Sequence, residues 1–275
     1  MHEFWLKFAG HRFGLAGLVF IVALIVLAVI YPFIVPYDPA AISNDIMMGP
    51  SARHWLGTDD LGRDVFAGMC QGIQVSLTVG FAAALASSVL GILIGSVAGF
   101  AGGRTDLGLM RFSEMFQVMP SFILAAVIVA IAGPGLARVV AVIAILAWPQ
   151  VARVIRGEVL RIRQLEFVDA VRCLGYREGA ILFHEVIPNA LPPVLAVGTL
   201  IVGQAILLEA SLSFLGLSSA DLISWGRMLN NGQRFLFDAW WLSFFPGAAI
   251  FLTVLAFNLV GDAVGAVLNP KGEQK

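Results

Sequence analysis

A polar stretch interrupts a largely apolar chain at residues 166–194, EFVDAVRCLGYREGAILFHEVIPNALPPV. It carries four carboxylates, two arginines and one histidine, and long apolar segments precede and follow it. Apolar segments of that length are typical of membrane spans. The stretch therefore separates the spans before it from those after it, and it requires a structure of its own outside the bilayer.

The composition places the chain in a membrane. Its 275 residues are 59% hydrophobic and 13% charged, whereas soluble domains are about 45–50% apolar and about 25% charged. The mean hydropathy is +0.89. A net charge of −1 gives no indication of nucleic-acid binding. We expect an integral membrane protein whose first partner is the lipid bilayer.

Six segments are long and apolar enough to cross a bilayer, which needs about 20 residues each. They are residues 13–35, 74–101, 108–133, 136–155, 192–215 and 242–267. The first is too long for a signal-peptide core and lacks a small-x-small cleavage site, so we expect it to be retained. The sequence predicts an all-α membrane protein with six transmembrane helices.

The basic residues predict which way the chain is inserted. If both termini are cytoplasmic, twelve Lys and Arg lie inside and five outside, as the positive-inside rule expects. The predicted parts are a cytoplasmic N-terminus with the first span, an extracytoplasmic segment, a core of five spans that includes a cytoplasmic loop, and a cytoplasmic tail. In that order they are residues 1–35, 36–73, 74–267 with the loop at 156–191, and 268–275.

The cytoplasmic loop predicts two short helices. One face of the first combines the apolar residues Phe167, Ala170, Val171 and Leu174 at helical spacing. Gly175 follows where a left-handed glycine would end that helix. Residues 176–187 predict a second helix, limited by Pro188.

The apolar face of the first helix needs a cover, because the other predicted cytoplasmic segments are short. One interpretation is a helix lying on lipid headgroups, which the nearby arginines would favour. The other is a helix that docks into a groove of a partner protein. The mixture of acidic and basic residues favours the groove, but the residues alone leave both interpretations open.

The same loop resembles the EAA loop of permease subunits of bacterial ABC importers. That pattern is E-A-A, three residues, G, nine residues, then I-x-L-P; here Asp169 replaces Glu, Val171 replaces Ala, Glu185 replaces Ile and Ile187 replaces Leu. The resemblance implies that the loop docks into a cleft of an ATP-binding subunit. The coupling residues it implies are Glu166, Phe167, Asp169, Ala170, Val171, Leu174, Gly175, Glu185, Ile187 and Pro188.

Three further stretches, residues 54–77, 211–229 and 246–270, are similar to dipeptide, oligopeptide and nickel permeases of such importers. The chain most resembles their dipeptide or oligopeptide C-type component. The resemblance implies the type I importer fold in a bacterial inner membrane. The implied partners are a homologous second permease, two ATP-binding subunits and an extracytoplasmic solute-binding protein.

The outer stretch contains Asp59, Asp60, Arg63 and Asp64 together with two glycines. A solvated network of turns would explain these charges. The resemblance instead implies an outer gate or a contact with the solute-binding protein, and both explanations can hold together.

The sequence contains no phosphate-binding motif with which the chain could use ATP to drive transport. A phosphate-binding loop ends in Gly-Lys-Ser/Thr, and none of the three lysines follows a glycine. We therefore expect no cofactor in this chain, with ATP and Mg²⁺ on the partner ATPases. An intramembrane enzyme is disfavoured because none of the four histidines lies in a predicted span and no metal-ligand spacing is present. A passive channel is the other rival class.

Ionisable residues inside spans are candidates for the translocation pathway. Arg111 and Glu114 are one turn apart, which favours a structural ion pair, and Asp262 lies near the inner end of the last span. Glu209 has no local cation, so it is either a pathway carboxylate or bonded to a neighbouring helix. We expect a short peptide as cargo, with nickel or a metal chelate as the alternative.

Small residues recur at four-residue steps in the second span, at Gly91, Gly95 and Gly99. Such a stripe predicts close packing of helices, either within the chain or between two chains.

Overall fold

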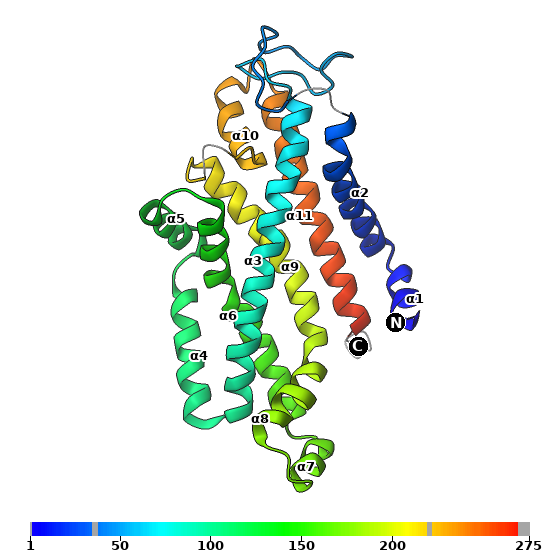
Figure 1. Cartoon of the computed structure of the whole chain (residues 1–275), viewed down its shortest axis with the longest axis vertical. Coiled ribbons are helices and arrows are strands. Elements are labelled where there is room, and N and C mark those ends of the chain that lie inside the picture. The colour runs from blue at the N-terminus through cyan, green and yellow to red at the C-terminus, as the bar shows by residue number, and fades with distance from the viewer. Residues whose placement is uncertain (1, 35–37, 219–221, 269–275) are drawn as a thin grey trace.

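The computed structural model describes residues 2–34, 38–218 and 222–268, which form a bundle of long helices (Figure 1). Helices satisfy their backbone polar groups internally, as the bilayer interior demands. The helices before the polar stretch are α1 (His2–Gly10), α2 (Arg12–Ile34), α3 (Val65–Ala101), α4 (Gly103–Val118), α5 (Ser121–Ala132) and α6 (Leu136–Ile162). Those from it onward are α7 (Glu166–Cys173), α8 (Glu178–Ala180), the π-helical turn η1 (Ile181–Val186), α9 (Ile187–Phe214), α10 (Trp225–Gly232), the 3₁₀ turn η2 (Gln233–Phe235) and α11 (Trp241–Leu268).

The all-α membrane fold is confirmed. Within the described ranges, five helical segments are long and apolar enough to cross a membrane, or six if the bent pair of α4 and α5 counts as one span. The third span, predicted as one helix over residues 108–133, is instead broken by a bend of 84°. Pro120 explains the break, because the residue before a proline is driven out of the helical region. Met119 is accordingly extended, at φ −94° and ψ 145°.

Two spans begin much earlier than predicted, and the bent α4–α5 pair begins at Gly103 rather than at residue 108. Helix α3 starts at Val65 because the Asp64 side chain caps it, accepting a hydrogen bond from the Ala67 amide at 2.9 Å. The fifth span starts at Glu178, where a continuous helical run begins that includes α8, η1 and α9 and ends at Phe214. The fourth span also extends past residue 155, to Ile162.

The glycine stripe of α3 faces α6 of the same chain. A Cβ at Gly95 would overlap the Ala152 carbonyl oxygen, and one at Gly91 would overlap the Val151 side chain. The stripe therefore serves packing within this chain, and glycine is required because the two backbones approach so closely.

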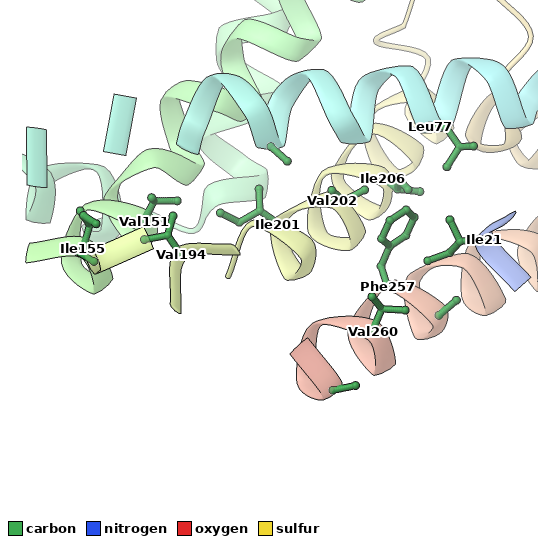
Figure 2. Close-up of a cluster of buried hydrophobic side chains, with 14 of the residues drawn as sticks. Ile21, Leu77, Val151, Ile155, Val194, Ile201, Val202, Ile206, Phe257 and Val260 are labelled. Carbon is green, nitrogen blue, oxygen red and sulfur yellow. The ribbon is translucent and has the colours of Figure 1, made fainter. Parts of the chain in front are cut away.

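The core gathers around α9, which packs against α3, α6, α10 and α11. Figure 2 shows Val194, Ile201, Val202 and Ile206 of α9 among buried residues from neighbouring helices, which are Ile21, Leu77, Val151, Ile155, Phe257 and Val260. Because lipid tails are as apolar as these side chains, their packing rather than their removal from water holds the bundle together.

The bundle has two distinct ends (Figure 1). Residues 38–64 and α10 lie at one end, which we call the α10 end. Helix α7 protrudes from the other, the α7 end, and α1 and the last turns of α11 lie toward it. The two predicted groups of site residues, around Asp59 and around Asp169, thus lie at opposite ends of the molecule.

Candidate functional site

Helix α7 forms as predicted. It covers Glu166–Cys173, and Gly175 follows with φ of +84°, a conformation that favours glycine. The Leu174 amide donates to the Ala170 carbonyl at 3.2 Å and the Gly175 amide to the Arg172 carbonyl at 3.0 Å. These bonds close the last turn, so the predicted end of this helix is confirmed.

The prediction of where the second helix ends was wrong. The chain re-enters a helix at Glu178 and does not stop at Pro188. Pro188 lies in the first turn after the π-helical residues of η1, and proline is tolerated in the first turn of an α-helix. Consequently the loop connects directly to α9, and Ile187 and Pro188 belong to that long helix.

One side of α7 is anchored to its own chain. Val168 is 0% exposed and belongs to the same buried cluster as Ile162, Ile181 and Val186, with Val171 packed partly against it. The apolar pattern that predicted the face around Phe167 did not include Val168. Val168 and Val171 are three residues apart, and this spacing was the sequence signal that could have revealed the second apolar side.

The other side of α7 is uncovered. Phe167 is 39% exposed and Leu174 is 76% exposed, and Ala170 is also exposed. We call these three residues the α7 apolar face. Of the other predicted coupling residues, Glu166 and Asp169 are exposed and Glu185 is partly buried, with its carbonyl accepting a bond from the Asn189 side chain at 2.7 Å.

An ion cluster links α7 to α8. The Arg172 guanidinium donates to Asp169 at 2.6 Å and to the two oxygens of Glu178 at 2.7 and 3.2 Å. The bond to Glu178, with the nearby Asp169 charge, raises the pKa of the Arg172 guanidinium above its usual value. Arg172 thus bridges α7 and α8 across the turn at Gly175.

Helix α6 holds the adjoining elements. Arg156 makes a two-pronged ion pair with Asp106 of α4, with an Nη2 to Oδ2 distance of 2.6 Å. Arg163 donates from Nη1 to the carbonyls of Gly99 and Phe100, at 2.8 and 3.0 Å. Those carbonyls end α3 and lack partners within that helix. The α7 end is therefore connected from α3 through α6 to α7.

At the α10 end the predicted outer residues come together. Asp59 accepts from the Arg63 Nε at 2.8 Å, and Asp64 bonds to the buried His54 Nδ1 at 2.8 Å. All four predicted residues line one cavity of about 280 Å³, which Arg227 and Asn231 of α10 also line. Arg227 was missed from sequence because it joins this cavity from a distant part of the chain. His54 lies only ten residues before Asp64 and was missed because spacing alone does not show their contact.

The ionisable residues of the spans occupy different surroundings. The Arg111–Glu114 pair is confirmed, at 3.0 Å and exposed, and Asp262 is exposed. Glu209 is 3% exposed and accepts from the Ser213 hydroxyl, one turn further along α9, at 2.5 Å. A pathway role for Glu209 stays a prediction.

Two larger cavities open beside α9. One of about 430 Å³ is lined by α5, α6 and α9, and one of about 840 Å³ by α5, α9, α10 and α11. They share the lining residues Phe122, Leu207 and Ser211. In the described part of the chain, no three His, Cys, Asp or Glu side chains are grouped as a metal site.

Comparison with known proteins shows which family the chain matches. Residues 91–273 match the family described as binding-protein-dependent transport system inner membrane component. Residues 1–50 match the N-terminal TM domain of oligopeptide transport permease C.

Individual relatives cover nearly the whole chain. It is 38% identical to the dipeptide transport system permease protein DppC of Alkalihalophilus pseudofirmus, over 95% of this chain and 86% of the relative. Identity is 37% to the oligopeptide transport system permease protein OppC of Bacillus subtilis, over 97% and 88%. It is 36% to the glutathione transport system permease protein GsiD of Pectobacterium atrosepticum, over 98% and 90%.

Proposed function

The chain belongs to the binding-protein-dependent transport system inner membrane component family, and from this premise we propose how it couples ATP hydrolysis to peptide import. It is a permease subunit of an ABC importer with the type I fold. In our proposal it forms half of a translocation pathway for short peptides, the cargo class for which its relatives are named. The other half comes from a homologous second permease.

The observation that carries the proposal is the uncovered α7 apolar face. Phe167 and Leu174 expose apolar surface at the tip of the molecule, while Val168, on another side of the helix, is buried against the bundle. An exposed apolar patch on an anchored helix is typical of a docking surface. We assign it to a cleft in a separate ATP-binding subunit, one of two in the complex, which would bind the ATP and Mg²⁺.

The connections of α7 would let it transmit motion from the ATPase to the membrane helices. Because helical structure is continuous from Glu178 to Phe214, a displacement at the docking helix is carried along α9 toward the α10 end. Arg156 and Arg163 link α6 to the α3–α4 turn, so those helices would move with it. Rigid-body motion of this kind is how such transporters alternate access between the two sides of the membrane.

We place the α7 end in the cytoplasm of a bacterial cell. The arginines at positions 153, 156 and 161 lie on the part of α6 that leads to α7, and Arg163 directly follows that helix, as the positive-inside rule expects for that side. The α10 end then faces outward, where the cavity lined by Asp59, Asp60, Arg63 and Asp64 would meet the solute-binding protein or act as an outer gate.

Purification of the assembled complex tests this function. We expect ATPase subunits to co-purify with the chain and peptide-loaded binding protein to stimulate their ATP hydrolysis and drive peptide uptake into proteoliposomes. A chain that purifies without any ATPase would contradict the importer. Uptake that proceeds equally without ATP would indicate the passive channel.

A further inference from the structure

The cavity between α5, α6 and α9 contains two amide side chains. Gln150 of α6 and Gln204 of α9 are both exposed, and both line this space of about 430 Å³. Among the residues that the structure describes, neither side chain has a hydrogen-bond partner. Each glutamine therefore presents an unused donor and an unused acceptor at the same opening.

Both glutamines lie far from the ends of their helices. An α-helix rises about 1.5 Å per residue, so Gln204 is about 15 Å from the Phe214 end of α9 and Gln150 is about 20 Å from the Leu136 end of α6. The apolar interior of a bilayer is about 30 Å thick. The two amides are consequently at membrane depth rather than at its surface.

Lipid cannot be the natural neighbour of this face. An amide that faces hydrocarbon keeps none of the hydrogen bonds that it makes in water, which is costly. Polar residues at this depth instead face a water-filled path, cargo or another helix. Glu209 differs from them, because it is buried within the bundle and already bonded to Ser213.

The chemistry of the lining suits a peptide backbone. A primary amide both donates and accepts, so it can bond to the C=O and N–H groups that every peptide presents. The lining has no ionisable side chain, and its remaining polar residues are Ser121 and Ser211. The adjoining cavity of about 840 Å³, which shares Leu207 and Ser211, is mostly apolar and has room for peptide side chains.

We propose that Gln150 and Gln204 form the peptide-contacting wall of the translocation pathway and hydrogen-bond to the backbone of the passing cargo. The assignment rests on the proposed function and adds the residues that meet the substrate. Neutral amides fit this task because a path must bind its cargo well enough to admit it and weakly enough to release it. Backbone recognition also accommodates peptides of different sequence.

The test uses the complete importer in proteoliposomes. Gln150→Met and Gln204→Met keep the length of each side chain and remove its hydrogen bonds, and the double variant removes both. The matched control is Gln74→Met, which alters an amide of α3 that bonds to the Ala28 carbonyl and does not line the cavity. The probe is radiolabelled trialanine, presented by the solute-binding protein.

We expect each single substitution to lower trialanine uptake about two- to tenfold, and the double substitution to lower it further. ATP hydrolysis and co-purification of the two permeases should stay at the wild-type level, as should uptake by Gln74→Met. Gln204→Asn, which keeps the amide, should retain more uptake than Gln204→Met.

Three outcomes would overturn the assignment. Undiminished uptake in the double variant would show that the amides do not contact cargo. Dissociation of the permease pair would show that they bond to the second subunit instead. Loss of uptake by Glu209→Gln, with the glutamine variants unaffected, would identify Glu209 instead of the glutamines as the pathway residue. Absence of ATP-driven uptake in the wild-type importer would instead refute the proposed function itself.

Discussion

Leu174 is the residue on which docking should depend most. It is 76% exposed and directly precedes the glycine that ends α7. Replacing it with aspartate places a charge in the middle of an apolar contact. Since burying a leucine is worth about 1.5–3 kcal/mol, we expect Leu174→Asp to lower ATP-driven uptake tenfold or more, measured in proteoliposomes.

The matched control is Leu236→Asp, an exposed leucine at the α10 end. It introduces the same charge at the opposite end from the α7 apolar face and should leave co-purification of the ATPases at the wild-type level. If Leu174→Asp retained wild-type uptake and a stable complex with the ATPases, the α7 apolar face would not be the contact.

Asp64 is a structural residue as much as a candidate gate residue. It caps α3 through the Ala67 amide and bonds to the buried His54. Loss of a helix cap costs about 1 kcal/mol, and His54 would lose its partner as well. We expect Asp64→Ala to destabilise the chain by about 1–2 kcal/mol in detergent thermal unfolding. Asp60→Ala is the comparison, and equal stability of the two variants would contradict the capping role.

At the scale of elements, the close contact between α3 and α6 limits the size of the side chain that fits at Gly95. A methyl group at Gly95 would overlap the Ala152 carbonyl, whereas one at Gly157 of α6 would meet nothing within 4 Å. Overpacking of this kind costs about 1–3 kcal/mol. Gly95→Ala should therefore lower the unfolding midpoint, while Gly157→Ala should leave it unchanged or raise it, as alanine favours helices. A tolerated Gly95→Ala would contradict the close packing.

The sequence predicted those elements whose limits are local. Helix α7 and its glycine end depend on apolar spacing and on one left-handed residue, so both could be found from the pattern. The break in the third span depends on Pro120, whose signal was hidden within a largely apolar segment. Pro188 led to the opposite error, because a helix end was predicted where the structure has none. Proline disrupts the interior of a helix but is tolerated in the first turn of the helix that follows.

The candidate site was harder to predict than the fold. Asp59, Arg63 and Asp64 were found because they are adjacent in sequence, whereas Arg227 joins their cavity from more than 160 residues away. Gln150 and Gln204 are polar residues inside two predicted spans, but the sequence does not show that they face the same opening. Their importance comes from opening into one cavity from two helices, which only the packing of α6 against α9 reveals.

For the whole molecule, the two native cysteines report orientation. Cys173 is exposed at the end of α7, and Cys70 is buried in α3. A membrane-impermeant maleimide should label Cys173 in inside-out vesicles and leave it unlabelled in intact spheroplasts, because we place α7 in the cytoplasm. Cys173→Ser, which retains Cys70, gives the background. Labelling from the outside would reverse the proposed orientation.

The same cysteine tests the central claim, that α7 docks into a separate ATPase. The measurement is the rate at which the maleimide labels Cys173 in inside-out vesicles that contain the two permeases, with and without the ATP-binding subunits. We predict fast labelling without those subunits and strong protection when they are bound. Equal labelling rates in both samples, with the ATPases demonstrably attached, would contradict the account.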